Sequence, residues 1–138
     1  MERTLFDRTL IGNMKLKNRI FMAPMGTTGE ADGAYCNEGI DYFEERAKGG
    51  VGLVLTGAVV CSEEFEPAPC QKLITVKDVY RLRRVVERVH DYGSKLGIQL
   101  SPGIGRMNWI DPSTPPYSAS PCPNYYTPEL TCRELPTD

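Results

Sequence analysis

The 138-residue sequence has little of what several classes of site require. Its net charge is −2 and no stretch forms a basic stripe, so nucleic acid is not expected as a partner. The five cysteines, an odd number, are widely spaced and form no C-x-x-C pair. This spacing argues against a disulfide framework and against a self-contained zinc or iron–sulfur site. We therefore expect reduced thiols and no metal ligands.

Long apolar runs are also missing. The longest, residues 51–61, is interrupted by Gly52, Thr56 and Gly57 and is much shorter than the about 20 residues that cross a bilayer. The first eight residues are charged, and no apolar stretch typical of a signal peptide follows them. We therefore expect a cytoplasmic protein without a membrane partner.

Short apolar segments separated by turn residues fill the first hundred positions. Residues 5–16 suggest a small hairpin around Gly12-Asn13, and residues 19–22 a short strand that stops at Pro24. Residues 26–35 are predicted to be a loop. Asn37 is a plausible cap for a helix that ends at Gly49-Gly50, and residues 51–60 then form a buried strand.

A second helix has the clearer signals. Thr75 and Asp78 have the spacing of a capping box, and Gly93 closes the segment. Apolar residues recur between them at helical spacing: Val79, Leu82, Val86 and Val89. A third strand is expected over residues 96–100, so that strands and helices alternate.

This alternation predicts an α/β fold with a parallel sheet and right-handed crossovers. We expect one partial domain over residues 1–138, made of an N-terminal hairpin or cap (1–18), a βαβαβ segment (19–100) and a proline-rich loop (101–138). The last segment holds eight of the eleven prolines and no apparent long element. Such a loop is either functional or separated from the structure that supports it.

Ligands of parallel α/β folds bind where the strands end. The three predicted strand ends combine small residues with Met25 and with one amide, that of Gln99. Such a surface suits a planar heteroaromatic ring, because small residues allow close approach and the amide can pair with an N–H/C=O edge. Taken alone, Met25 is equally well explained as core packing, and Gln99 as an amide satisfied without a ligand.

Three motifs in register resemble the old yellow enzyme family. They are L-K-N-R-I followed by M-A-P-M at 16–25, Y-F-x-E-R-A-K-G-G-V-G-L at 42–53, and H-D-Y-G-S-K with I-Q-L at 90–100. The resemblance covers almost the whole chain. The Q-L-S-P-G-I-G-R segment at 99–106 is similar to the branch that contains 2-enoate and 2,4-dienoyl-CoA reductases, which are NAD(P)H:flavin oxidoreductases.

The resemblance implies that the chain is the first three βα units of a TIM (β/α)8 barrel, incomplete, that binds FMN. Arg106 occupies the family's G-R position and is interpreted as structural. The implied FMN-contacting residues are Ala23, Pro24, Met25, Gly26, Gly57, Ala58 and Gln99.

The resemblance also implies what these 138 residues do not include. The family's later strands carry the substrate-binding pair, the proton donor and the FMN phosphate site. Larger members add an iron–sulfur cluster and an FAD region, which are absent here. His90, the single histidine, lies on the second predicted helix, remote from the strand ends, so we assign no catalytic residue.

The main hypothesis is therefore the N-terminal portion of an FMN-dependent ene-reductase that reduces enoates, enones or dienoyl thioesters with NAD(P)H. One alternative is a non-catalytic half-barrel completed by self-association or by a separate C-terminal chain. Another is a degenerate fragment, and topology alone also allows a phosphate-binding barrel. Because three strands leave an open edge and an exposed apolar face, we expect poor stability, weak or absent FMN binding and no turnover by the chain alone.

Overall fold

The computed structural model describes residues 2–27, 30–65, 70–108 and 111–136. The chain divides into two compact units. Unit 1 comprises Met1–Val59 and Pro69–Gln99, and unit 2 comprises Val60–Ala68 and Leu100–Asp138. No helix in the described ranges is long and apolar enough to cross a membrane.

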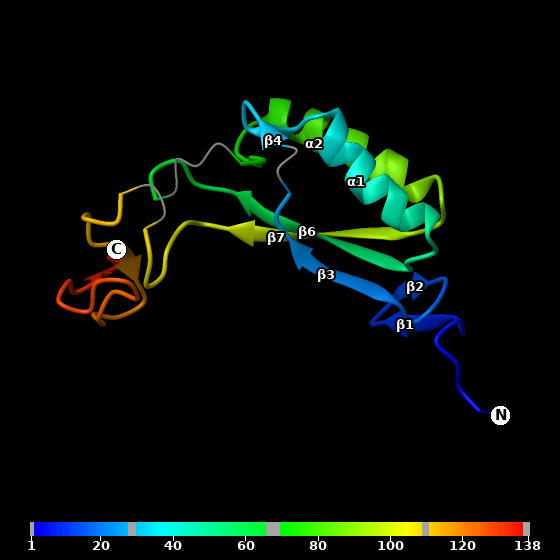
Figure 1. The fold of residues 1–138 in the computed structure, drawn as a ribbon, viewed down its shortest axis with the longest axis horizontal. Helices are drawn as coiled ribbons and strands as arrows, with labels where there is room; N and C mark the ends of the chain where they lie inside the picture. The colour runs from blue at the N-terminus through cyan, green and yellow to red at the C-terminus, as the bar shows by residue number, and fades with distance from the viewer. Residues whose placement is uncertain (1, 28–29, 66–69, 109–110, 137–138) are drawn as a thin grey trace. The chain divides into compact units, whose positions relative to one another are not determined.

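Unit 1 contains a three-stranded sheet with the order β3-β6-β7 (Figure 1). The strands are β3 (Phe21–Met25), β6 (Leu53–Val60) and β7 (Lys95–Ser101), and their arrows run in the same direction. The expectation that the first strand stops at Pro24 is wrong. Proline is tolerated there because β3 is an edge strand, which needs fewer backbone donors.

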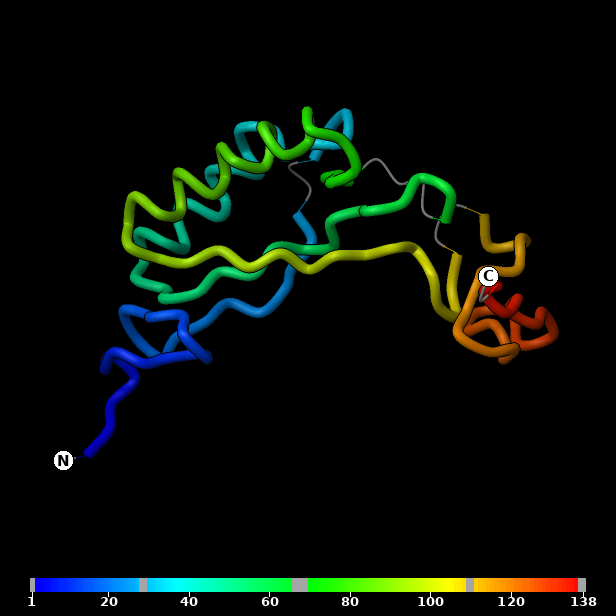
Figure 2. Tube along the Cα trace, turned by 180° about the vertical axis from the view of Figure 1, so that it is seen from behind, coloured from blue at the N-terminus to red at the C-terminus, as the bar shows by residue number. Residues whose placement is uncertain are grey.

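Two helices, α1 (Asn37–Lys48) and α2 (Val76–His90), lie side by side on one face of this sheet (Figures 1 and 2). The cap of α1 is Cys36, one residue before the predicted Asn37. The predicted capping box of α2 is present, because the Asp78 carboxylate accepts the Thr75 N–H at 2.8 Å. The alternation of strands and helices is therefore confirmed.

The core of unit 1 lies between the helices and the sheet. It is built from buried residues of β5 (Ala34–Tyr35), α1, β6 and α2. Its members are Tyr35, Ile40, Phe43, Ala47, Val54, Leu82, Val85 and Val89. Phe43 is fully buried, and its ring makes edge-on contacts with Tyr35 at 5.1 Å and with Tyr42 at 5.3 Å between ring centroids.

The buried face of α2 differs from the predicted apolar stripe. Leu82 and Val89 are buried as expected, but Val85 completes the face and Val79 is 53% exposed. Helical spacing allows either Val85 or Val86 to be buried, and the position of the helix on the sheet decides between these two residues. Val79 instead borders an apolar groove of about 380 Å³ with Leu73, Leu82, Val86 and Ile98.

Two hairpins flank the sheet. The predicted one is confirmed as β1 (Thr9–Ile11) paired with β2 (Met14–Leu16). The second, β4 (Glu30–Ala31) with β5, lies inside the segment expected to be a loop. Its turn is Asp32-Gly33, both with positive φ, which is a common hairpin turn. Fully buried Gln71 accepts the Tyr35 N–H at 3.0 Å and so fixes this hairpin.

The L-K-N motif joins the first hairpin to the helix ends. Lys17 Nζ donates to the carbonyl oxygens of Ala47 and Tyr92, at 3.4 and 2.8 Å. Buried Asn18 donates from Nδ2 to the Gly50 carbonyl at 2.6 Å. A cation and an amide thus satisfy carbonyl groups that helix C-termini leave open. These residues of the motif therefore have a structural role.

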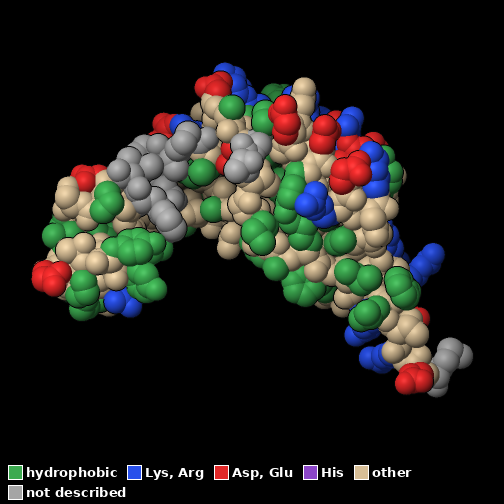
Figure 3. Space-filling view, in the orientation of Figure 1, with side chains coloured by type: hydrophobic (Ala, Val, Ile, Leu, Met, Phe, Trp, Pro, Cys, Tyr) green, Lys and Arg blue, Asp and Glu red, His purple; other side chains and the backbone are tan. Residues whose placement is uncertain are grey.

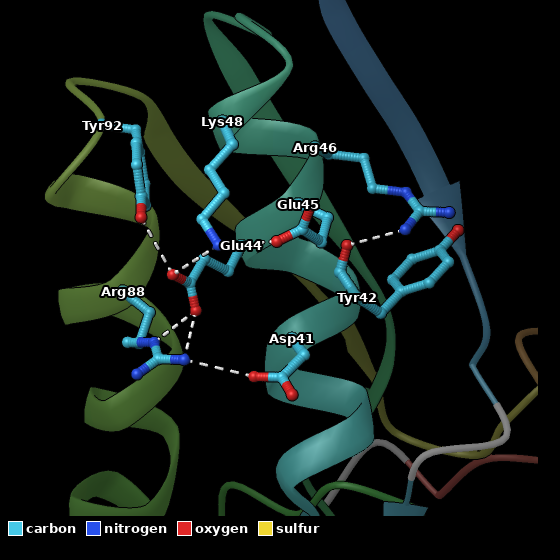
Figure 4. A network of polar contacts seen from close by, with 8 residues as sticks. All are labelled: Asp41, Tyr42, Glu44, Glu45, Arg46, Lys48, Arg88 and Tyr92. Atoms are coloured by element: carbon cyan, nitrogen blue, oxygen red, sulfur yellow. Dashed lines mark hydrogen bonds and ion pairs between the residues drawn. The ribbon is translucent and has the colours of Figure 1, made fainter.

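A buried carboxylate links the two helices (Figure 4). The Glu44 side chain is only 8% exposed and pairs with Arg88 of α2. Its other oxygen accepts from the Tyr92 hydroxyl at 3.0 Å and lies 3.3 Å from Lys48 Nζ. Burial alone raises the pKa of Glu44, but the hydrogen bonds from Arg88, Tyr92 and Lys48 outweigh it and hold the pKa below its usual value of 4.5.

This lowered pKa predicts acid sensitivity. A carboxylate with a lowered folded-state pKa stabilises the fold above its unfolded pKa, and that stabilisation is lost as the pH falls through the folded value. We expect the free energy of unfolding to decline below about pH 4.5, and to decline less in Glu44→Gln. Urea unfolding between pH 3 and 7, at about half-unit steps, measures this. Exposed Glu45→Gln is the matched control, and an acid dependence equal in all three proteins would contradict the prediction.

Unit 2 is mostly irregular, as the prolines predict. Its two strands, β8 (Tyr117–Ser118) and β9 (Arg133–Glu134), form a short parallel pair. Residues 61–65, which follow β6, belong to unit 2, where the Phe65 ring lies edge-on to Tyr117 with centroids 5.3 Å apart.

Candidate flavin-binding strand ends

The ends of β3 and β6 are in direct backbone contact. A Cβ atom on Gly57 would lie 2.8 Å from both the Gly26 Cα and the Met25 carbonyl oxygen. Contacts under 3.0 Å to backbone atoms cannot be relieved by a side-chain movement. Glycine is therefore required at position 57 for the two strand ends to approach, and three of the predicted residues, Met25, Gly26 and Gly57, meet here.

Thr56, the residue before Gly57, connects β6 to β7. Met25 is paired with Thr56 across an irregular register between β3 and β6. Thr56 is fully buried, and its Oγ1 accepts the Gln99 N–H at 3.2 Å while donating to the Gly57 carbonyl at 2.8 Å. The three strand ends that were predicted separately thus form one continuous edge in unit 1.

Most of the predicted residues at this edge are accessible. Gly57 is buried, whereas Met25 is 57% exposed and the other five are also exposed: Ala23, Pro24, Gly26, Ala58 and Gln99. Over unit 1, Figure 3 shows hydrophobic side chains gathered on the strands and charged ones on the helices. The edge therefore offers backbone, small apolar groups and one amide to a ligand.

None of these seven residues is titratable, so the edge can hold and orient a ligand but has no acid or base to transfer a proton. His90 is exposed at the last position of α2. Arg106 belongs to unit 2, where its Nε donates to the Pro123 carbonyl at 3.0 Å. This contact agrees with the structural interpretation of Arg106.

Neither the charged cavity of unit 1 nor a cluster of metal-ligating side chains offers another site in the described part of the chain. A cavity of about 500 Å³ lies between α1 and α2, but charged residues such as Asp41, Arg84 and Arg88 line it, away from the strand ends. Such a lining does not suit an apolar ring. Within the described ranges, no group of three or more His, Cys, Asp or Glu residues is placed to hold a metal ion.

Thr56 was not among the predicted site residues. It is the one hydroxyl-bearing residue in the otherwise apolar strand 51–60, and a polar side chain at such a position must find partners when buried. That signal was available in the sequence. Which partners it finds, however, depends on the neighbouring strand, and only the structure shows them.

The sequence is similar to known flavin oxidoreductases. Residues 4–132 match the NADH:flavin oxidoreductase / NADH oxidase family. Cinnamate reductase of Clostridium sporogenes is 37% identical over 145 aligned residues, which cover 99% of this chain and 22% of the relative. NADH oxidase of Thermoanaerobacter brockii is 36% identical and is matched over 21% of its length. The chain thus spans about one fifth of these relatives.

Solved structures give the same result for the fold. An old yellow enzyme homologue from Zymomonas mobilis superimposes with a TM-score of 0.78 at 27% identity, covering 99% of this chain and 41% of that one. The solved structures that this chain resembles are TIM barrels, and the sheet described here is an open, three-stranded part of such a barrel. The chain belongs to the NADH:flavin oxidoreductase / NADH oxidase family.

Proposed function

We propose that this chain forms one wall of the FMN site in an ene-reductase that uses NAD(P)H. The observation that carries the proposal is the joined edge of β3, β6 and β7, where six of the seven predicted FMN residues are exposed. Membership of a flavin oxidoreductase family supports it.

The residues at this edge fit a flavin ring. The exposed Gln99 amide can both donate and accept, which matches the alternating polar edge of a pyrimidine. A Cβ on Gly26 would meet nothing within 4 Å, so open space lies beside the backbone there. Met25 and Ala58 add apolar surface. When bound, FMN would supply hydride transfer, and the protein would supply binding and orientation.

The proposed substrates are small molecules with activated C=C bonds, namely enoates, enones or dienoyl thioesters. The similarity to a protein named cinnamate reductase supports an enoate among them. Since the strand ends described here carry no acid, the proton that completes such a reduction must come from groups outside this edge.

An FMN titration of the purified chain, followed by flavin fluorescence and sedimentation, tests the proposal. The sequence alone left weak or absent binding as the expectation. With the strand ends joined and exposed, we expect weak, saturable binding with one FMN per chain, because one wall of a site gives only part of its contacts. Absence of saturable binding by chain shown to be folded by circular dichroism would contradict the proposal. Riboflavin is a useful comparison, because it tests recognition of the ring without the phosphate.

A second candidate function is assembly with further β/α units. The groove is formed mainly by α2 and β7, and its lining is apolar except for Arg83: Leu73, Val79, Leu82, Arg83, Val86 and Ile98. In a β/α barrel each unit packs against the next one, so a further unit is the proposed occupant of this groove. A sedimentation mass that increases with concentration would support a second copy of this chain as the occupant of the groove. A constant monomer mass would exclude self-association, and the occupant would then have to come from a different chain.

A further inference from the structure

We propose that Thr56 is a positioning residue that sets the place of Gln99 at the FMN edge. The inference rests on the proposed flavin site, and it concerns a residue that the family resemblance did not mark. Its observation is a pair of hydrogen bonds made by one fully buried hydroxyl group, one to each of two residues implied in FMN binding.

The geometry of Thr56 uses both functions of its hydroxyl. Oγ1 donates its hydrogen to the Gly57 carbonyl at 2.8 Å and accepts the Gln99 N–H at 3.2 Å. The Gln99 backbone N–H is therefore held by a side chain of the neighbouring strand. The Thr56 side chain is buried and belongs to β6, so its hydrogen bond fixes the position of the Gln99 backbone relative to β6.

The same hydroxyl also holds Gly57, the next residue of β6. Gly57 is the residue whose missing Cβ allows the backbone of Gly26 to approach. Thr56 fixes the carbonyl of Gly57, and Met25 is in register with Thr56. One side chain thus connects the residues implied in FMN binding on all three strands, although it does not itself reach the exposed edge.

The chemistry predicts different results for two substitutions. Thr56→Val keeps the branched shape and the strand preference but removes the hydroxyl, leaving the Gln99 N–H without this acceptor. Thr56→Ser keeps the hydroxyl and loses only a methyl group. If packing were the role of Thr56, serine would be the more harmful change; if positioning is the role, valine is.

Two measurements on the full chain test the proposal. Amide hydrogen exchange, read at Gln99 by NMR, reports the hydrogen bond without any need for FMN. FMN titration, with the flavin absorption spectrum recorded, reports its consequence. We expect Thr56→Val to speed exchange at Gln99 about tenfold and to weaken FMN binding about tenfold with a changed flavin spectrum, and Thr56→Ser to restore both.

The outcomes separate this inference from the proposed function. Unchanged Gln99 exchange in Thr56→Val, with all proteins equally folded, would overturn the inference whatever FMN does. Faster exchange with unchanged FMN affinity and spectrum would also overturn it, since Thr56 would then only stabilise the fold. If the unmodified folded chain does not bind FMN, the proposed function fails, and the positioning of Gln99 toward FMN fails with it.

Discussion

Replacing Phe43 with alanine is expected to destabilise unit 1 by about 3–5 kcal/mol, the usual cost of removing a fully buried phenylalanine. The ring has no exposed surface, and it touches Tyr35 and Tyr42 edge-on from the centre of the core. Small domains have a total stability of about 5–15 kcal/mol, so a domain at the low end of that range would lose most of its stability. Urea unfolding followed by circular dichroism measures the change.

The matched control is Phe6→Ala, the same substitution at a ring that is 76% exposed. It is expected to change the free energy of unfolding by no more than about 0.5 kcal/mol. Equal effects of the two substitutions would mean that the packing between α1 and the sheet does not hold unit 1 together. A non-cooperative transition in the unmodified chain would favour the degenerate-fragment alternative.

Local signals predicted the helices and strands of unit 1 well. Ile40, Phe43 and Ala47 have helical spacing, and all three are buried where α1 meets the sheet. Thr75 and Asp78 form their capping box from neighbouring residues alone, so the sequence contains all the information needed. Elements whose causes lie within a few residues are the ones that sequence reasoning finds.

The failures involve partners that are distant in the sequence. The β4–β5 hairpin was expected to be a loop, although Asp32-Gly33 is a hairpin turn signal. Its strands are only two residues long and are held by Gln71, 36 residues after Tyr35. The contact between the Phe65 and Tyr117 rings, 52 positions apart in the chain, likewise has no local signal in the sequence.

The proximity of the candidate site residues could be expected from the sequence, because the topology brings strand ends together in any parallel sheet. The residues named on β3, β6 and β7 do lie along one edge of unit 1. The sequence could not show that Gly57 is buried against Gly26, nor that Thr56 joins Gly57 to Gln99. Those contacts depend on the register between strands, which the sequence pattern did not specify.

Gly57→Ala is expected to be the most harmful single-atom change at the proposed FMN edge. The added Cβ would lie 2.8 Å from the Gly26 Cα and from the Met25 carbonyl oxygen, so β3 and β6 must separate. Overpacking of this kind costs about 1–3 kcal/mol, and the moved strand ends would no longer present Met25 and Gln99 together. We therefore expect both a lower urea midpoint and a loss of saturable FMN binding.

Gly26→Ala is the control on the other side of the same contact. A Cβ at Gly26 meets nothing within 4 Å, so the urea midpoint should remain close to that of the unmodified chain. If FMN lies against this strand end, however, the methyl group occupies space that the ring needs, and binding should weaken without loss of stability. Unchanged FMN binding in Gly26→Ala would place the flavin elsewhere. An unchanged urea midpoint in Gly57→Ala would mean that the two strand ends are not held in contact.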